Sequence, residues 1–526
     1  MQPPAATGNS SSVGSLDGGL RRHMFAPLEA RTLELERLLL DIDASIRCTY
    51  DVGLEYEDNM LDTSDGIARK GDEAFDTDQI DGGSRASASG RYAAWTPVGL
   101  PRQNLVLCVG RICNEAHSGR LNSCSILLEG SFKHSFGSRI KLDLGGILDD
   151  HCNHHDGTFG SGYSLFPGQI VAVEGNNPLG SAMRDSRIIE GIHLQCKSSH
   201  ECNISTADDR SFSVWAACGP YTTSTDLEYD PLLDLIERVV SDKPQVVILC
   251  GPFVDARQSL VIGENGVGPS IEDNEGDVGR CGGKRVITAE NVFRLKVSSL
   301  LAEMYELNPD SGTQFVLVPS LDDAFIDAVY PQAPFVCSGD GRNGKFCDLG
   351  LQEVETSGLV DIRTKKSQTR VHLPSNPCTL RIKDVMVGVT STDILFHLAS
   401  EGCNGGIPLG SRLARLAGHL VGQGSYYPLF PAPTGMPLDM TKSKEWEIPC
   451  MLDVLIVPSR LEPFARVAAY GNGSAGTTLV VNPGVLTKFS TGGTYSRINI
   501  QGAKKEIHGV KGNNILDRIS AVIMHI

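Results

Sequence analysis

The chain has 526 residues, of which 40% are hydrophobic and 21% are charged, so it is long enough for two or three globular domains. Its formal net charge of -16 disfavours a free-standing nucleic-acid-binding protein, because affinity for phosphate depends largely on clustered Lys and Arg. The apolar runs are strand-sized, which predicts no transmembrane segment. The 15 cysteines include no Cys-x-x-Cys pair of the kind found in zinc or redox motifs, so we predict reduced thiols. The polar N-terminus lacks the apolar stretch of a secretory signal, which predicts an intracellular protein.

The N-terminal part of the sequence divides into three segments by composition. Residues 1–22 are rich in Gly, Ser and Pro and are predicted to be a disordered tail. Residues 23–52 carry apolar side chains at near-helical spacing, which predicts one amphipathic helix that either packs on the body of the protein or binds a partner. Residues 53–95 are acidic and contain few large apolar side chains, so we predict a flexible linker.

Residues 96–205 contain short apolar runs separated by Gly, Asn and Asp, a pattern typical of a small β-barrel. The runs begin near Leu105, Ser125 and Gln169. A Phe-Pro-Gly sequence at residues 166–168 predicts a tight turn that leads into the third of these strands. Because short strands with Gly at bends suit that fold, we predict an OB barrel.

From residue 206 to residue 526, predicted strands alternate with predicted helices, which indicates a layered α/β domain. Two Gly-rich and charged segments, residues 261–285 and 337–368, interrupt the alternation and are predicted to be surface insertions. The regular elements are predicted at residues 212–217, 245–250, 314–318 and 453–457 for the strands and at residues 231–240 and 289–307 for the helices.

Four loops follow these predicted strands, and in an open α/β sheet the loops at the carboxyl ends of the strands carry the ligands. Catalytic or ligand-binding residues are therefore expected in these four loops. The candidate residues are Ala217, Cys218 and Gly219 in the first loop, Pro252 and Asp255 in the second, Ser320, Leu321 and Asp322 in the third, and Ser459 and Leu461 in the fourth.

Six stretches of sequence in one order resemble the B (accessory) subunits of replicative DNA polymerases. The resemblance implies an OB domain followed by an inactivated calcineurin-like phosphodiesterase domain, an α/β sandwich. The stretches around Cys218 and Tyr330 are most similar to those of the polymerase alpha members of this family. The six stretches are residues 217–224 with 229–232, 251–257, 318–322 with 329–332, 390–398, 425–429 and 482–494.

Active phosphodiesterases of this fold hold two metal ions with Asp, Asn and His side chains at these strand ends, where the metals activate a hydrolytic water. In this sequence Pro252 stands where a bridging Asp would be, Ser320 and Leu321 replace Asn and His, and Ser459 and Leu461 replace two His residues. The resemblance therefore implies that the site is degenerate, that no metal or other cofactor binds and that the protein is not an enzyme.

Some potential ligands remain in the sequence. Asp255, Asp322 and Asp323 are either remnants of an acidic site or, as we favour, carboxylates that cap helices and hydrogen-bond turns. The run from His151 to His155 is the dense cluster of potential metal ligands. We favour a solvated loop over a metal site there, because no second pair of ligands is in view.

The resemblance implies a non-catalytic accessory subunit of DNA polymerase alpha–primase in the nucleus. Such a protein holds the C-terminal domain of the catalytic subunit, reaches primase through the complex, and contacts DNA weakly or indirectly during the initiation of replication and primer synthesis. An acidic body fits a protein partner better than bare DNA, and no membrane partner is expected. The alternatives are the B (accessory) subunits of polymerase delta or epsilon and, from another class, an active metallophosphoesterase or nuclease.

The family usually carries a helical N-terminal domain ahead of the linker, whereas only about two dozen residues precede Met24 here. We expect that domain to be lost or to lie outside this sequence.

Overall fold

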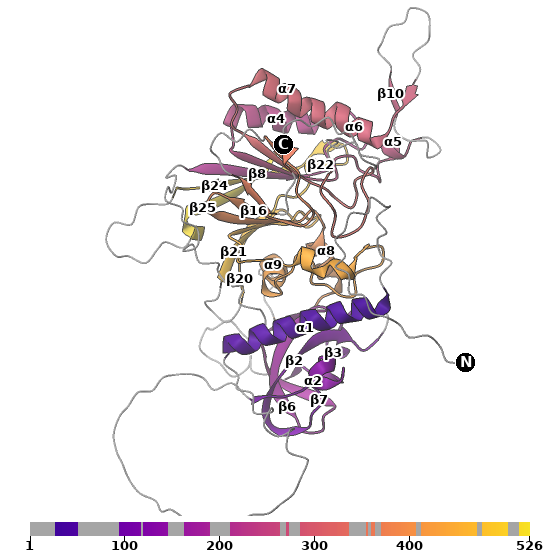
Figure 1. The fold of residues 1–526 in the computed structure, drawn as a ribbon, viewed down its shortest axis with the longest axis vertical. Helices are drawn as coiled ribbons and strands as arrows, with labels where there is room; N and C mark the ends of the chain where they lie inside the picture. Colours follow the sequence, from indigo (N-terminus) through magenta and orange to yellow (C-terminus); the bar gives the residue numbers. More distant parts are fainter. Residues whose placement is uncertain are drawn as a thin grey trace, which may run out of the picture.

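The structure is a computed structural model that describes residues 27–50, 94–116, 119–145, 162–189, 211–263, 270–272, 284–335, 354–355, 359–362, 370–406, 412–470, 476–502 and 515–526. These residues form a β-barrel, a two-sheet α/β sandwich, and a helix, α1, that lies between the two (Figure 1). The predicted tail, nearly all of the predicted linker and the run from His151 to His155 lie outside the described residues. No helix in the described part of the chain is long and apolar enough to cross a membrane.

The predicted barrel is confirmed as a closed sheet in the strand order β2-β3-β4-β7-β6, with β6 pairing back to β2. Neighbouring strands are antiparallel except β4 and β7, which are parallel. Burial alternates along β4, so that Ile140 and Leu142 face the barrel core while the residues between them face solvent. The elements are β1 (Ala94–Trp95), β2 (Arg102–Asn114), β3 (Ile126–Glu129), α2 (Phe132–Ser135), β4 (Arg139–Asp143), β5 (Tyr163–Leu165), β6 (Ile170–Asn177) and β7 (Ala182–Ile189).

Residues 94 and 95, which composition assigns to the linker, form β1 and pair in parallel with β2. Trp95 is buried among apolar side chains of α1 and the barrel. The barrel sheet therefore begins before residue 96.

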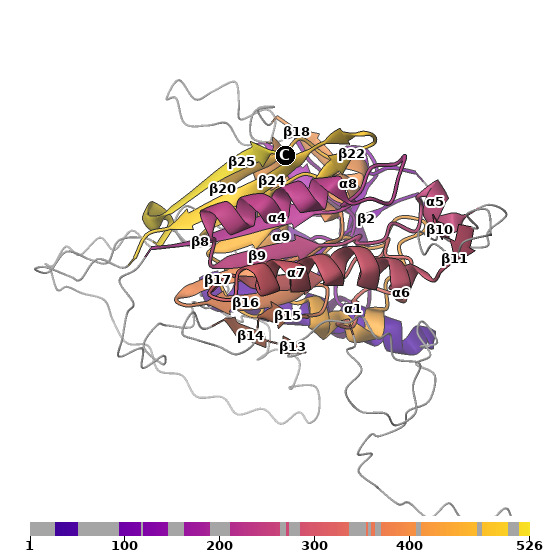
Figure 2. The ribbon, with the colours of Figure 1, turned by 90° about the horizontal axis from the view of Figure 1, so that it is seen from above.

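The sandwich consists of two sheets packed face to face, with helices on both outer faces. Figure 2 shows α4 and α7 lying over β8 and β9 of the first sheet. The first sheet has the order β13-β15-β12-β9-β8-β24-β25, and the second has the order β14-β16-β17-β19-β21-β20. A layer of buried Val, Ile, Leu and Cys side chains fills the space between the sheets.

The strands of the sandwich are β8 (Phe212–Cys218), β9 (Val246–Cys250), β12 (Gln314–Val318), β13 (Val354–Glu355), β14 (Leu359–Ile362), β15 (Val371–His372), β16 (Cys378–Ile382), β17 (Val385–Val389), β19 (Val454–Ile456), β20 (Phe464–Tyr470), β21 (Gly476–Asn482), β24 (Thr494–Ile500) and β25 (Ile519–His525). Its helices are α4 (Asp230–Asp242), α5 (Ser259–Ile262), α6 (Ala289–Val292), α7 (Ser299–Leu307), α8 (Ile394–Glu401) and α9 (Arg412–Gly422). Short elements complete it: β10 (Ser270–Glu272), β11 (Lys284–Val286), β18 (Cys403–Gly405), β22 (Thr487–Lys488), β23 (Thr491–Gly492), the π-helical turn η4 (Phe293–Ser298) and the 3₁₀ segments η6 (Met440–Trp446) and η7 (Ile515–Arg518).

The pattern of apolar residues explains why these segments form the strands and helices of the sandwich. The central strands β9 and β12 are buried along their whole length, as parallel strands covered on both faces must be, so they read as unbroken apolar runs. Helix α4 buries Leu232, Leu235, Ile236 and Val239 on one face, which are spaced to pack against the first sheet. The helix predicted at residues 289–307 is present as α6, η4 and α7 in continuous succession.

The two predicted insertions contain regular structure. Within residues 261–285, β10 and the first residues of β11 form a two-stranded antiparallel sheet that pairs with no other described strand. Within residues 337–368, β13 and β14 lie at the edges of the two large sheets. The second segment therefore extends the sandwich, while the first projects from it (Figure 1).

The barrel is fixed to the sandwich by backbone pairing. Strand β5 of the barrel pairs antiparallel with β18, which belongs to the sandwich. Gln423, from the end of α9, donates from its amide to the carbonyl of Ile170 at 2.9 Å and accepts from the Ile170 N–H at 2.8 Å. The backbone N–H of Phe430 donates to the Pro167 carbonyl at 3.0 Å. The carbonyl of Pro167 and both backbone groups of Ile170, at the two ends of the barrel turn, therefore find hydrogen-bond partners in the sandwich.

Helix α1 (Leu28–Tyr50) packs on the body of the protein, which decides between the two interpretations of its sequence. Its buried side chains Leu39, Ile42 and Ile46 contact the barrel. On the opposite flank, Arg37 forms an ion pair with Glu447 at 2.7 Å and donates to Ser443 at 2.8 Å. Both of these residues belong to the sandwich, so α1 bridges the two domains.

Gly168 has a positive φ of 90°, and a β-carbon there would lie 2.5 Å from the backbone nitrogen of Phe430. Replacing Gly168 by Val should therefore lower the free energy of unfolding by more than about 2 kcal/mol, since it combines left-handed backbone strain with a steric clash. Gly119→Val tests the strain alone, because Gly119 has a φ of 112° and open space around it. Gly312→Val is the control, because its site is open and no positive φ is required there. Denaturant unfolding measures all three, and equal losses at Gly168 and Gly312 would contradict this account.

Candidate functional site

The carboxyl ends of both sheets meet at one edge of the sandwich. Cys218, Cys250 and Val318 lie side by side at the ends of β8, β9 and β12. The parallel strands β17, β19 and β21 of the second sheet end in the same way. The hydroxyl of Ser391, which follows β17, donates to the Pro319 carbonyl, which follows β12, at 2.6 Å. The predicted loops are therefore brought together at one edge, as the sequence predicts.

Backbone fills the position where a side chain of the first loop would project. A β-carbon on Gly219 would lie 1.9 Å from the carbonyl oxygen of Pro252, so no larger residue fits. Ala217 and Cys218 are buried, and the Cys218 thiol donates to the Gly251 carbonyl at 3.2 Å. Burial raises the pKa of the Cys218 thiol well above its usual value. The thiol is therefore protonated at neutral pH.

Asp323 is buried beneath the second and third loops and is 3% exposed. Its carboxylate accepts hydrogen bonds from the backbone N–H groups of Val254 at 3.2 Å and Ser320 at 2.9 Å, and also from that of Phe253. Burial raises the pKa of Asp323 to about 7, although these three N–H donors oppose the rise. The carboxyl group is thus used to hold two loops together, as we expected of a turn-forming carboxylate.

Asp255 and Asp322 lie close together and share one cation. Arg257 contacts Asp322 at 2.6 Å and Asp255 at 3.4 Å. Asp255 also accepts from the Arg257 backbone N–H at 2.9 Å. A guanidinium group therefore lies beside the two carboxylates that the sequence singled out as possible remnants of an acidic site.

A second arginine lies at the same edge. Arg460 donates to Asp393 from its backbone N–H and from Nε, both at 3.0 Å, and its guanidinium lies 4.5 Å from the centre of the Phe396 ring. Asp393 also caps α8, because its other oxygen accepts from the Phe396 N–H at 3.2 Å. Asp393 thus caps α8 and forms an ion pair with Arg460 at the same time.

The remaining candidate residues stabilise turns. Ser320 and Ser459 are buried, and each hydroxyl accepts a backbone N–H two residues further along. Leu321 and Leu461 pack against the apolar layer outside the second sheet. Asn482 holds the last loop, because its side-chain oxygen accepts from the N–H groups of Ser459 and Gly484, both at 2.9 Å.

Among the described residues, no three or more His, Cys, Asp or Glu side chains are placed to hold a metal ion. At this edge, Asp255 and Asp322 pair with Arg257 and Asp393 pairs with Arg460, while Asp323 is buried. Sequence reasoning missed Arg257, Arg460, Asp393 and Asn482. A signal was present for the arginines, since each lies within one or two residues of a candidate position.

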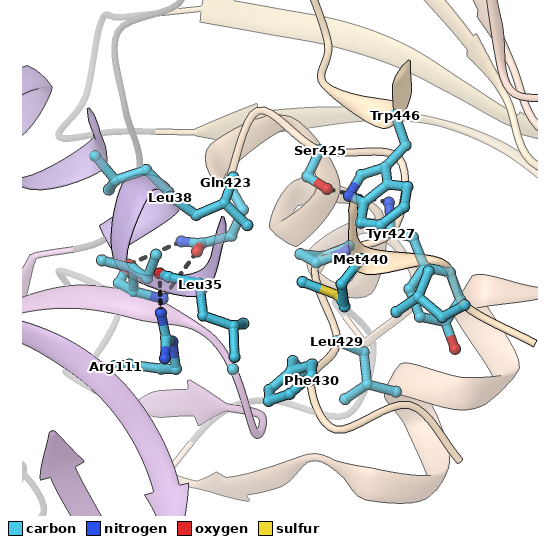
Figure 3. A pocket seen from close by; sticks show the side chains of 15 residues that line it. Leu35, Leu38, Arg111, Gln423, Ser425, Tyr427, Leu429, Phe430, Met440 and Trp446 are labelled. Atoms are coloured by element: carbon cyan, nitrogen blue, oxygen red, sulfur yellow. Dashed lines mark hydrogen bonds between the residues drawn. The ribbon is translucent and has the colours of Figure 1, made fainter. Parts of the chain in front are cut away.

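A second feature is a cavity of about 50 Å³ where α1, the barrel and the sandwich meet. Figure 3 shows Leu35 and Leu38 of α1 on one side of it and Tyr427, Met440 and Trp446 of the sandwich on the other. The cavity is much smaller than the roughly 300 Å³ of an ordinary ligand pocket. Its lining shows that the three parts of the protein share one apolar junction.

Asp323 provides a test of the strand-end geometry. Its pKa in the folded protein, about 7, lies above the ordinary value of 3.8, so the folded state binds its proton more tightly than the unfolded state. The free energy of unfolding of the wild type, measured relative to that of Asp323→Asn, should therefore fall as pH rises from about 4 to about 7. Above that range the difference between the two proteins should level off. Thermal or denaturant unfolding across this range measures the difference. Asp310→Asn, at an exposed position, is the control, and parallel pH profiles for wild type and Asp323→Asn would refute the assignment.

Comparison with known proteins gives the family. A family model that describes the B subunits of DNA polymerases alpha and epsilon matches residues 214–466, which lie in the sandwich. A second family model, which describes the OB domain of the B subunit of DNA polymerase alpha, matches residues 91–191, the barrel.

Curated relatives agree with these models. The chain is 34% identical to the DNA polymerase alpha B subunit of Mus musculus over 81% of this chain and 60% of the relative. The corresponding protein of Rattus norvegicus is 34% identical, over 80% of this chain and 58% of the relative. That of Schizosaccharomyces pombe is 28% identical, over 76% of this chain and 60% of the relative. The chain thus spans only about three fifths of the length of the relatives it matches.

The barrel and the sandwich each match a model of the same family, in the order that the structure shows, and relatives of one name align across both domains. The chain therefore belongs to the family of DNA polymerase alpha B subunits.

Proposed function

We propose that this protein is a non-catalytic accessory subunit of a DNA polymerase alpha–primase complex and acts there as a scaffold. The observation that carries the proposal is the family match, which covers the barrel and the sandwich separately and aligns with relatives across both. A match to one domain alone would support only a shared fold.

The domain junction supports a scaffolding role. Strand pairing between β5 and β18, the amide of Gln423 and the bridging helix α1 join the barrel to the sandwich at three separate places. Two domains held in this way present one continuous surface of fixed shape. Such a surface binds a partner at a lower entropic cost than two domains on a flexible hinge.

The strand-end edge supports the absence of catalysis. By the resemblance to calcineurin-like phosphodiesterases, metal ligands would occupy the positions of Ala217, Cys218, Gly219, Pro252, Ser320, Leu321, Ser459 and Leu461, with Asp255 and Asp322 retained. We propose that these positions are a degenerate site. Arg257 and Arg460 supply positive charge beside the remaining carboxylates, which an occupied two-metal centre would otherwise supply.

We further propose that the partner is the C-terminal domain of the polymerase alpha catalytic subunit, that primase is reached through the complex, and that the protein works in the nucleus during replication initiation. A net charge of -16 supports a protein partner and only weak or indirect contact with DNA. The B subunits of polymerase delta and epsilon are less favoured, because the barrel matches the model for polymerase alpha and the relatives carry the alpha name. An active phosphoesterase is disfavoured by the geometry of Gly219 and Pro252.

The absence of catalysis is tested directly. Purified protein in manganese or magnesium should hydrolyse neither bis-p-nitrophenyl phosphate nor single-stranded DNA above the rate of a blank, because the edge offers ion pairs in place of a metal centre. The matched control is Asp255→Asn combined with Asp322→Asn, which removes the two carboxylates that pair with Arg257. Turnover by the wild type that disappears in this variant would overturn the scaffold proposal.

Partner binding is tested by co-expression with the C-terminal domain of a polymerase alpha catalytic subunit. We expect a stable complex that buries on the order of 2,000 Å² or more, as permanent assemblies do, and only roughly micromolar or weaker binding of single-stranded DNA at physiological salt. Light scattering coupled to gel filtration and fluorescence anisotropy measure the two. Replacing residues 263–285 by a Gly-Ser link, which keeps the buried Val261 of α5, should leave the complex intact, because β10 and β11 pair only with each other among the described strands. Tight DNA binding without affinity for the polymerase domain would contradict the proposal.

A further inference from the structure

Three large apolar side chains are exposed at one end of the barrel. Phe132 is 71% exposed and Phe136 is 81% exposed, at the two ends of the short helix α2, and Leu179 is 82% exposed in the turn between β6 and β7. Single exposed apolar side chains are common on protein surfaces, whereas a group of them on adjoining loops is a feature of interaction sites. We call these three residues the apolar rim.

The three side chains come from loops that touch. A β-carbon on Gly137 would lie 3.8 Å from a ring carbon of Phe132, so that ring lies against the turn that carries Phe136. A β-carbon on Gly99 would lie 3.0 Å from Ser138 and 3.9 Å from the carbonyl of Gly180. Gly99 therefore sits between the turn of Phe136 and the turn of Leu179, so the two turns that carry the rim side chains adjoin each other.

The apolar rim is not part of the contact between the barrel and the sandwich. The barrel docks through β5 and through the turn at residues 166–170, whereas α2 lies on the barrel near α1 (Figure 1). The contact from α1 nearest to the rim is Glu36, whose carboxylate accepts from the backbone N–H groups of Phe132 and Lys133, each at 3.0 Å. The docked barrel thus leaves the rim side chains open to a further partner.

The rim loops themselves carry basic side chains in an acidic protein, and the acidic neighbour Glu36 of α1 is partly buried, with its carboxylate bound to the Phe132 and Lys133 N–H groups. Residues 97–105, 131–138 and 178–181, the loops that meet there, include Arg102 and Lys133 and no Asp or Glu. Both cations are exposed. Across residues 94–145 and 162–189 the barrel has eight Lys and Arg against five Asp and Glu, in a chain whose net charge is -16. The barrel end is therefore complementary to an anionic ligand.

The exposed apolar side chains and the two cations together favour one class of ligand. Two exposed cations are few for a phosphate backbone, whose binding needs several, so the two exposed phenyl rings lack the basic groove that accompanies base stacking in single-strand-binding sites. A second copy of the chain would place two basic rims against each other, because a twofold contact is made by the same patch on both copies. An acidic peptide with apolar side chains along one face satisfies both the exposed rings and the cations.

We propose that the apolar rim, flanked by Arg102 and Lys133, is a docking site for an acidic amphipathic segment of a partner protein. The site recruits a protein beyond the catalytic subunit of the proposed function, and it is independent of the strand-end edge of the sandwich. Phe132 and Phe136 supply the apolar contact, and the two cations orient the acidic face of the segment.

The test is a selection of a random peptide library on the full chain, with counter-selection on a variant that combines Phe132→Ala and Phe136→Ala. We expect the enriched peptides to be acidic, with apolar residues at helical spacing. In fluorescence anisotropy, a selected peptide should lose at least tenfold in affinity for this variant and severalfold for Arg102→Gln combined with Lys133→Gln. Its affinity should also fall as salt is raised.

Leu307→Ala is the matched control, because Leu307 is 73% exposed at the end of α7 in the sandwich. Melting temperatures should be unchanged in all variants, since every altered side chain is exposed, and the glutamine variant remains informative if the alanine variant unfolds. The proposal is overturned if no acidic amphipathic peptide is enriched, if the selected peptides bind the alanine variant as tightly as the wild type, or if a labelled oligo-dT binds the wild type tightly and loses affinity in the alanine variant. The last result would assign the rim to nucleic acid instead.

Discussion

The hydrogen bonding between the barrel and the sandwich is the constraint on which the rest of the structure depends. A backbone N–H or carbonyl that leaves water must find another partner, and here β5 finds it in β18 while Ile170 finds it in the side chain of Gln423. Next to this pairing, the buried Ser164 hydroxyl donates to Asn404 at 2.6 Å and is hydrogen-bonded to His419 at 2.8 Å. Burial lowers the pKa of His419 to about 3, so the junction carries no uncompensated imidazolium at neutral pH. The polar contacts fix one register between the domains, which apolar contacts alone do not specify.

Helix α1 adds a second layer to the same junction. Its apolar face is buried on the barrel, yet Arg37 reaches two residues of the sandwich, and the buried guanidinium of Arg111 in the barrel donates to the carbonyl of Leu35. The small cavity beside Leu35 and Leu38 marks where the curved surfaces of three elements do not fill space completely. Because α1 contacts both domains, it adds a further set of contacts to the junction. These contacts hold the two domains in one relative position and oppose a hinge motion between them.

The strand-end edge shows how a fold can keep its loops in place without a metal ion. Metal ligands draw loops from several strands together. In this protein the same loops are joined by Asp323 with its three backbone N–H donors, by Asn482, and by the ion pairs of Arg257 and Arg460. The carboxylates that remain are thus accounted for as structural groups. The basic end of the barrel lies apart from this edge, so the surface that we assign to a partner does not compete with the groups that stabilise the sandwich.

The sequence by itself determined the domain order, the barrel, the alternation of strands and helices in the sandwich, and the meeting of the candidate loops at one edge. These features follow from hydrophobic period and from turn residues, which act over a few neighbours along the chain. It also indicated that the surviving carboxylates bind turns. Only the tertiary structure decided that α1 packs on the body, that residues 94 and 95 belong to the barrel, and that parts of the second insertion are edge strands. The same holds for the pairing of Arg257 with Asp322 and of Gln423 with Ile170, since their partners are separated by tens to hundreds of residues in the chain. Such contacts leave no periodic signal in one sequence, because their geometry exists only after distant strands have been brought together.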